Sequence, residues 1–375
     1  MPGSSALKEY LKRPCIAMIG PSLQHARGGM ASVVLAYKEA GLFSNWPILY
    51  LETHKEISAV RKLLLGISSF CRFVYLLIQG RVGLLHIHVA GQVSFLRKSA
   101  FMLAADLFGV PYILHLHGSA FRTFYDTASG KLIKKYIRYV FDRATFLIAL
   151  SDEWRQWLSG ITTNRNIRLI FNPVNLPDEF THDDSSNRIL NIVFLGKLTE
   201  KKGIADLLKA YALVLERSSV PTHLYCGGDG DRLMVDELIR DLSLNEYVSL
   251  LGWIQGEAKH QLLNKADALV LPSYNEVLPM SILEALAYGV PVVATRVGAI
   301  ADAVSDGVEG LLVSPGDIHA IADAILTIVT NAETRKFMRK NARAKADNCF
   351  NDKAVISEIS QLYTEILGDK YAQSI

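Results

Sequence analysis

The stretch PSYNEVLPMSILEALAYGVPVVA, residues 272–294, predicts a loop, a helix and a strand in that order. Pro279 suits the first turn of the helix, and Gly289 ends the helix before the apolar strand. Glu276 is therefore expected in the loop at the helix N-terminus, and Glu284 about a turn and a half inside the helix. At a rise of roughly 1.5 Å per residue, the two carboxylates are on the order of 10 Å apart. This spacing suits the two ends of one elongated ligand.

The helix N-terminus between the two glutamates is a favourable place for an anion. Its free backbone N–H groups and the positive end of the helix dipole attract phosphate groups. A carboxylate on either side can accept hydrogen bonds from the hydroxyl groups of a sugar and of a ribose. The stretch thus indicates a site for a nucleotide sugar. The alternative is that Glu276 and Glu284 are ordinary solvated acids.

Residues 272–285 closely resemble the E-x7-E signature of the retaining glycosyltransferases of family 4, which have the GT-B fold. The resemblance implies that Glu276 orients sugar hydroxyls and that Glu284 binds the ribose. Val277 departs from the family pattern, which often has glycine or another small residue there, and the change bears on the choice of donor. The resemblance also includes three residues between the glutamates in the donor site: Leu278, Pro279 and Met280.

Two further blocks in the second half of the chain resemble the same family. In GKLTEKKG, residues 196–203, the resemblance implies that Lys197 and Lys202 grip the donor diphosphate through charge-assisted hydrogen bonds worth roughly 1.5–3 kcal/mol each. GGDG, residues 227–230, resembles the family's glycine turn. Taken alone, such lysines are more typical of solvated surface, and most glycine turns only satisfy backbone geometry. The donor-binding residues expected from these blocks are Gly196, Gly228 and Gly230, with Trp253 and Ile254 beside the base.

The first half of the chain carries a similar glycine loop. Gly28 and Gly29 follow an apolar strand and open a helix, which resembles the family's N-terminal loop. There, bare backbone is expected to approach the sugar and phosphate. An ordinary tight turn explains these glycines about as well.

A pair of histidines follows another buried strand, at the carboxyl end where open α/β sheets bind ligands. The resemblance gives His117 the position of the family's cleft histidine, which contacts the transferred sugar. The catalytic set expected from the resemblance is therefore His117, Lys197, Lys202 and Glu276. Alternation of side chains puts His115 on the same face, where a core histidine is the more typical interpretation. His86 and His88 are expected to be structural or acceptor-side residues.

Length and composition predict two domains. The 375 residues exceed a single core, and 50% hydrophobic with 21% charged residues describes a globular enzyme. Apolar runs separated by helical patterns predict two parallel sheets with crossovers. The runs lie at 15–19, 84–89, 111–116, 145–150 and 167–171, and then at 190–195, 222–226, 247–251, 268–272, 290–294 and 310–313. The expected fold class is α/β of the GT-B type, with two Rossmann-like domains facing a central cleft.

The domain boundaries follow from the same pattern. We expect an acceptor-side Rossmann-like domain at 1–178 and a Rossmann-like domain for the nucleotide-sugar donor at 179–350. The polar segment 181–187 has the composition of a linker. Residues 351–375 are expected to include a C-terminal helix that packs back on the first domain, as is common in this fold.

The net charge of +3 conceals a division along the chain. Residues 1–178 carry 21 Lys and Arg against 10 Asp and Glu, a net charge of +11, whereas residues 179–375 carry a net charge of −8. Basic and apolar residues are interleaved at 55–81 and 131–139, which favours an anionic membrane surface as a partner. A solvated helix face explains the pattern equally well. Nucleic acid is not an expected partner, because the chain has no recognised base-reading motif.

Several classes of feature are not expected. Residues 63–80 are apolar but short and are interrupted by Arg72, and residues 1–10 lack the apolar core of a signal peptide. The four cysteines show no paired spacing, and no cluster has metal-ligand spacing. We therefore expect no disulfide, metal or cofactor, and a cytoplasmic location, peripheral on the inner face of the cell membrane.

The resemblance implies a reaction. A retaining, metal-independent hexosyltransferase would move a hexose from a GDP- or UDP-linked donor to a lipid-linked or other membrane-associated glycan, as in bacterial surface polysaccharide or glycolipid synthesis. The acceptor would attack from the face of the leaving group. Two alternatives stay open: a catalytically silent subunit that binds nucleotide sugars, and a GT-B epimerase that acts on a nucleotide sugar without an acceptor.

Overall fold

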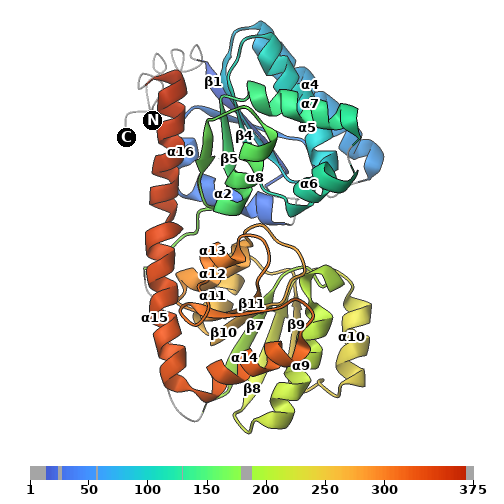
Figure 1. Ribbon diagram of the computed structural model, residues 1–375, viewed down its shortest axis with the longest axis vertical. Helices are drawn as coiled ribbons and strands as arrows, with labels where there is room; N and C mark the ends of the chain where they lie inside the picture. Colours follow the sequence, from blue (N-terminus) through green and yellow to red (C-terminus); the bar gives the residue numbers. More distant parts are fainter. Residues whose placement is uncertain (1–13, 24–27, 56–57, 129, 179–187, 369–375) are drawn as a thin grey trace. The chain divides into compact units, whose positions relative to one another are not determined.

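The computed structural model describes residues 14–23, 28–55, 58–128, 130–178 and 188–368. The chain divides into two units: unit 1 is Met1–Pro173 with Asp352–Ile375, and unit 2 is Val174–Asn351. Each unit contains a six-stranded parallel sheet with helices around it, so the predicted two-domain α/β fold is confirmed (Figure 1). The divisions lie a few residues from the boundaries expected at 178/179 and 350/351. The predicted linker at 181–187 and the segment 1–10 lie outside the described residues.

The sheet of unit 1 has the strand order β2-β1-β3-β4-β5-β6. Its strands are mostly continuous apolar runs, because a parallel sheet is covered on both faces. β2 is the strand that the sequence did not predict. It lies at the sheet edge, and most of its side chains are only partly buried. The strands are β1 (Cys15–Gly20), β2 (Ile48–Glu52), β3 (Val82–Val89), β4 (Tyr112–Leu116), β5 (Phe146–Ala149) and β6 (Ile167–Leu169).

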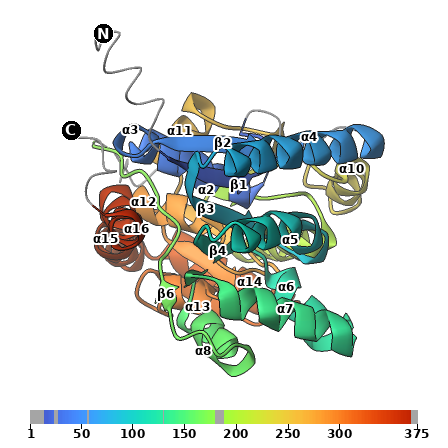
Figure 2. The same cartoon turned by 90° about the horizontal axis from the view of Figure 1, so that it is seen from above.

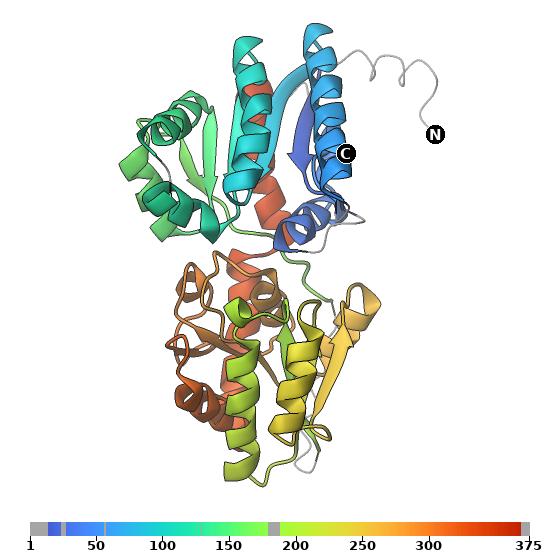
Figure 3. The same cartoon turned by 90° about the vertical axis from the view of Figure 1, so that its right-hand side faces the viewer.

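Helices cover both faces of this sheet (Figures 2 and 3). In Figure 3, α4 and α5 lie in front of the sheet and α16 lies behind it. α4 contacts α5, and α5 contacts α7, whereas α16 contacts α2 and β3. The helices are α2 (Gly29–Glu39), α3 (Leu42–Asn45), α4 (Ala59–Ile78), α5 (Gln92–Leu107), α6 (Ser119–Thr123), α7 (Lys131–Arg143), α8 (Asp152–Ile161) and α16 (Asp352–Leu367), with a π-helical turn at Phe124–Ala128.

The C-terminal helix α16 packs on unit 1 although its sequence follows unit 2. Ser360 accepts a hydrogen bond from Trp46 Nε1 (3.0 Å), and the Tyr363 ring meets the Trp46 ring edge-on. Tyr363 also reaches His86 in β3. Among the described residues, no helix is both long and apolar enough to cross a membrane.

The sheet of unit 2 has the order β12-β11-β10-β7-β8-β9. All six strands fall at apolar runs that the sequence marked. α9 and α14 contact each other and β10, while α12 contacts β10, β11 and α15. The strands are β7 (Leu190–Leu195), β8 (Thr222–Gly227), β9 (Val248–Gly252), β10 (Ala268–Leu271), β11 (Val292–Thr295) and β12 (Gly310–Val313). The helices are a 3-10 turn (Glu200–Lys202), α9 (Ile204–Arg217), α10 (Arg232–Asp241), α11 (Glu257–Asn264), α12 (Met280–Ala287), α13 (Ile300–Ala303), α14 (Ile318–Thr330) and α15 (Ala332–Cys349).

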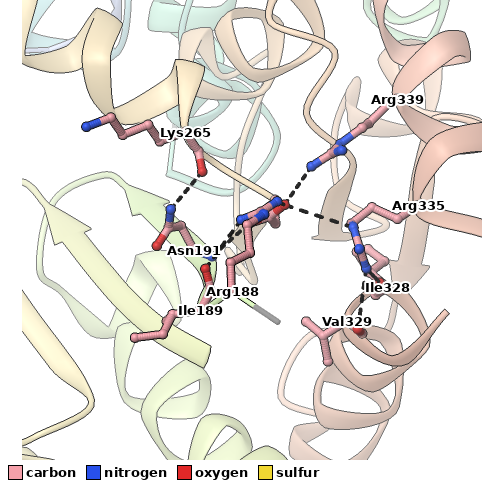
Figure 4. Close-up of polar contacts among 9 residues, drawn as sticks. Arg188, Ile189, Asn191, Lys265, Ile328, Val329, Arg335 and Arg339 are labelled. Atoms are coloured by element: carbon pink, nitrogen blue, oxygen red, sulfur yellow. Dashed lines mark hydrogen bonds and ion pairs between the residues drawn. The ribbon is translucent and has the colours of Figure 1, made fainter. Parts of the chain in front are cut away.

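A cluster of charged residues around a buried aspartate lies at the amino end of the unit 2 sheet (Figure 4). The Asp267 carboxylate, immediately before β10, is fully buried. Arg188 Nη1 donates to Asp267 Oδ2 (2.7 Å), and Arg339 Nη2 donates to Oδ1 (2.6 Å). The Asn191 backbone N–H also donates to Oδ2 (2.8 Å), and Arg335 lies 3.9 Å away. The cluster therefore ties the starts of β7 and β10 to α15.

Candidate functional site

The stretch with the two glutamates folds as a loop and a helix at the carboxyl end of the unit 2 sheet. α12 begins at Met280, so Pro279 stands just before the first helical residue instead of within the first turn. Glu284 consequently lies about one turn into the helix, slightly nearer its N-terminus than predicted. Gly289 has a φ of +64° and follows the helix end, as the sequence predicted.

Glu276 is held by partners from two neighbouring strand ends. Ser273 Oγ donates a hydrogen bond to Glu276 Oε1 (3.0 Å). Lys202 Nζ, on the segment that follows β7, forms an ion pair with the same oxygen. The Glu276 side chain is 10% exposed and that of Lys202 is 28% exposed, so the pair remains open to solvent on one side. The structure thus brings together two residues that were both predicted from the sequence to bind the sugar donor.

Glu284 has a lysine partner that the sequence did not indicate. Lys259 Nζ on α11 forms an ion pair with Glu284 Oε1 at 2.6 Å. The side chains are 27% and 16% exposed. The two residues are 25 positions apart, and no local pattern links them. Each predicted glutamate is therefore paired with a partly exposed lysine: Glu276 in the loop before α12, and Glu284 near the middle of the helix.

Two glycines allow the loops around Glu276 to pack backbone against backbone. A Cβ on Gly228 would lie 1.8 Å from the Gly196 carbonyl oxygen, so the predicted glycine turn packs directly on the loop after β7. Gly298 has a φ of +54°, and a Cβ there would lie 2.1 Å from the Glu276 carbonyl oxygen. Ala299 N then donates to the Val277 carbonyl (2.7 Å). The sequence analysis missed Gly298, although its place after β11 resembles that of the other loop glycines.

The remaining predicted donor residues lie on the same loops. Lys197 is exposed, and Gly230 is held by the loop after β7, since a Cβ there would lie 2.4 Å from the Leu198 carbonyl oxygen. Trp253 and Ile254 are partly buried beyond the end of β9, and the Ile254 side chain packs against Gly227. Leu278 and Met280 are buried and anchor the loop to the core.

Unit 1 holds the other predicted residues. Gly28 and Gly29 stand at the N-terminus of α2, and a Cβ built on either glycine meets no heavy atom within 4 Å among the described residues outside its chain neighbours and the helix backbone. His117 follows β4 and is partly buried.

Four histidines form a compact array on β3 and at the end of β4. His88 Nδ1 lies 2.8 Å from His117 Nε2, and His86 Nε2 lies 3.4 Å from His115 Nδ1. Rings from the same strand segment also stack: the ring centroids of His86 and His88 are 4.6 Å apart, and those of His115 and His117 are 4.1 Å apart. The sequence predicted one shared face for His115 and His117 but did not predict the whole array. The pattern His-x-His on two successive strands was the available signal.

Burial keeps these imidazoles neutral. It lowers the pKa of His117 to about 3, with smaller contributions from Lys98 and His86. Burial also lowers the pKa of His86 to about 3 and holds the pKa values of His88 and His115 well below the ordinary value. His117 at neutral pH is therefore an uncharged hydrogen-bonding group.

Both halves of the chain match glycosyltransferase families. Residues 182–345 match the glycosyl transferases group 1 family, and residues 39–173 match the glycosyl transferase 4-like domain.

Individual relatives agree with these matches. The uncharacterized glycosyltransferase MJ1607 of Methanocaldococcus jannaschii is 29% identical over 52% of this chain, and the match spans only about half of that relative, 54% of its length. The UDP-Gal:alpha-D-GlcNAc-diphosphoundecaprenol alpha-1,3-galactosyltransferase of Escherichia coli is 28% identical over 72% of this chain and 73% of that protein. The structure of Anabaena HepE in complex with UDP-glucose superposes with a TM-score of 0.74 at 18% identity, covering 93% of this chain and 99% of that one.

Proposed function

We propose that this chain, which belongs to the GT-B glycosyltransferases of the family 4 type, transfers a hexose from a nucleoside diphosphate sugar to a glycan or lipid-linked acceptor with retention of configuration. The observation that carries the proposal is the ion pair of Lys202 with Glu276 just before the N-terminus of α12, with Glu284 about one turn into the same helix. Two carboxylates and a cation beside free helix N–H groups match the hydroxyls and diphosphate of such a donor.

The diphosphate is the group that unit 2 is best equipped to bind. Lys197 is exposed and Lys202 partly exposed, so both ammonium groups can reach an anion in solvent. Their charge, with the helix N-terminus, would stabilise the negative charge that develops on the departing phosphate. The acceptor hydroxyl would pass its proton to that phosphate oxygen. This route uses no side-chain nucleophile, metal or cofactor.

The two glutamates would serve opposite ends of the donor. Glu276 would accept hydrogen bonds from sugar hydroxyls, and Glu284 from the ribose. Their lysine partners are partly exposed, and such ion pairs contribute only about 0–1 kcal/mol to stability. A donor can therefore replace part of either ion pair at low energetic cost. Trp253 and Ile254 would border the base.

The base is the less defined part of the donor. The Escherichia coli relative is named for UDP-galactose, and the Anabaena structure contains UDP-glucose. These names favour a UDP-linked hexose over a GDP-linked one. In unit 1, neutral His117 would contact the transferred sugar, and Gly28 and Gly29 would offer backbone to the donor.

Unit 1 also carries an apolar and basic surface suited to a membrane. α4, α5 and α7 are adjacent helices (Figure 2). Each exposes large apolar side chains. Arg61 and Arg72 are exposed on α4 among them, and Lys62 is partly exposed. Phe73, which the sequence pattern suggested for this surface, is fully buried against Phe101 instead. The exposed apolar residues are Val60, Leu63, Leu64, Ile67, Tyr75, Ile78, Val93, Leu96, Leu103, Leu107, Leu132 and Tyr139.

This surface would hold the enzyme reversibly on the anionic inner face of the cell membrane, where a lipid-linked acceptor resides. Each basic residue near such a leaflet contributes roughly 1 kcal/mol, screened over about 10 Å at 0.1 M salt. Changing Arg61, Lys62 and Arg72 to glutamate should reduce cosedimentation with anionic liposomes and leave nucleotide-sugar hydrolysis largely intact. The matched control changes Lys209, Arg232 and Arg240 on unit 2 to glutamate. If the wild-type protein does not bind anionic liposomes at low salt, the membrane interpretation is wrong and a soluble acceptor becomes the better hypothesis.

The central test of the proposed function is a panel of UDP- and GDP-linked hexoses, incubated with the protein with and without lipid-linked acceptors. We expect nucleoside diphosphate release from one donor and faster release with a suitable acceptor. Binding of the donor without any release would favour the silent subunit. Conversion of the nucleotide sugar to its epimer without an acceptor would favour the epimerase.

A further inference from the structure

The parallel register of β3 and β4 brings three buried histidines onto one face of the unit 1 sheet. His88 stands directly opposite His115, and His86 lies two residues earlier on β3. Because alternate side chains of a strand point to the same face, all three imidazoles share one side. Tyr363 of α16 reaches His86 there, and the Tyr37 ring of α2 lies about 6 Å from the rings of His88 and His115. All three histidines are fully buried.

One pair of nitrogens in this cluster has the separation expected of two ligands of a single metal ion. One ligand atom from each histidine lies within 4.8 Å of the others. His86 Nε2 and His115 Nδ1 are 3.4 Å apart. Two nitrogens bound to one tetrahedral zinc ion at about 2.0–2.1 Å stand roughly 3.3 Å apart. The spacing is also long for a hydrogen bond, whose usual length is about 2.9–3.0 Å.

Unpartnered polar atoms accompany this geometry. Within the described part of the chain, His88 Nε2, His115 Nε2 and the Tyr37 hydroxyl are buried without a hydrogen-bond partner. Buried polar atoms are nearly always hydrogen-bonded, and an exception in one cluster calls for a bound ion or water. An ion bound to His88 Nε2 would give that atom a partner.

The surroundings of the histidines resemble those of a metal site. Metal-binding histidines usually bond their second ring nitrogen to a polar group that fixes the ring. Tyr363 Oη lies 2.6 Å from His86 Nδ1 and can serve this role. Lys98, a neighbouring cation, directs its Nζ to the His88 backbone carbonyl. His117, beside His88, is partly buried.

We propose that His86, His88 and His115 bind one divalent transition-metal ion, with Zn²⁺ as the best match to three imidazoles. The ion would be structural: it would fasten β3 to β4 and, through Tyr363, to α16. It takes no part in the sugar transfer proposed above. The inference is therefore independent of that function.

The experiment uses the full chain without a histidine tag. The protein is unfolded with chelator present, freed of metal, and refolded with Co²⁺, which replaces Zn²⁺ and reports its coordination by visible absorption. Because the ion is present while the protein refolds, slow entry of the ion into the buried site cannot explain a lack of binding. We expect one ion per chain with the absorption of tetrahedral coordination, displaced by Zn²⁺.

Four variants and a control decide where the ion binds. Tyr363→Phe keeps the packing of the ring and should weaken Co²⁺ binding by about 10–100-fold. His86→Gln, His88→Gln and His115→Gln, checked for folding by circular dichroism, should weaken it at least as much. His223→Gln in unit 2 should leave it unchanged. Absence of bound Co²⁺ in refolded wild-type protein would overturn the proposal. Equal binding by the wild type and the folded variants would also overturn it and indicate an adventitious ion only.

Discussion

The two ends of the unit 2 sheet both carry paired charges, but in opposite surroundings. At the amino end, Asp267 is fully buried and bonded to Arg188 and Arg339. At the carboxyl end, Glu276 and Glu284 pair with lysines that are 28% and 27% exposed. The carboxylate–cation contacts are thus more deeply buried at the amino end of the sheet than at the carboxyl end.

Burial decides what each contact can do. Removing one partner of a buried charge cluster leaves the other charges uncompensated, which costs about 3–5 kcal/mol. A partly exposed pair is solvated when its partner leaves, and its loss costs about 0–1 kcal/mol. The amino end is therefore suited to holding strands and α15 together, and the carboxyl end to exchanging partners with a ligand.

The largest effect is expected from Asp267→Asn. The change keeps the side-chain shape but leaves Arg188, Arg335 and Arg339 without their shared carboxylate. We expect the free energy of opening of β7 and β10, measured by amide hydrogen exchange, to fall by about 3–5 kcal/mol. Asp236→Asn, which removes the exposed partner of Arg232, is the control and should cost less than about 1 kcal/mol. Equal effects of the two changes would mean that burial does not decide the cost of losing a carboxylate.

An intermediate effect is expected from Glu276→Gln, which should act on sugar binding rather than on stability. The amide can still accept the Ser273 hydrogen bond but loses the charge. Affinity for the nucleotide sugar should fall by about 1.5–3 kcal/mol in calorimetry, while affinity for the nucleoside diphosphate changes less. Glu257→Gln on exposed α11 is the control. An equal loss for both ligands would contradict the assignment of Glu276 to the sugar.

The smallest effect is expected from Lys259→Ala. It removes the partner of Glu284 but keeps the carboxylate, and the pair is partly exposed. Amide exchange in α11 and α12 should report a loss of no more than about 1 kcal/mol. Destabilisation as large as that from Asp267→Asn would mean that the ion pair at the carboxyl end of the unit 2 sheet is structural too.

The sequence revealed features that depend on neighbouring residues. Buried strands appear as apolar runs, and the loop from Ser273 to α12 lies within one short stretch. β2 was missed although Ile48 to Leu51 form a short apolar run, and in this edge strand only Leu51 is buried. The helix start was displaced by one residue because a proline fits both before and within a first turn.

Contacts between distant positions could not be predicted in the same way. Arg339 is 72 residues from Asp267, and Lys259 is 25 residues from Glu284, so only the folded chain brings them together. The histidine array could be predicted only in part. Alternation along each strand was readable, but the pairing of His88 with His115 depends on the register of β3 and β4.

The most direct test of the central claim, that this end of unit 2 binds a nucleoside diphosphate, is calorimetry on wild type, Glu284→Ala and Lys202→Ala. Each folded protein is titrated with a nucleoside diphosphate, UDP or GDP, and with the matching nucleoside. Glu284→Ala should weaken both ligands by about 1.5–3 kcal/mol through the ribose, whereas Lys202→Ala should weaken only the diphosphate. Unchanged affinity in Glu284→Ala, or equal weakening of both ligands or of neither in Lys202→Ala, would contradict the account.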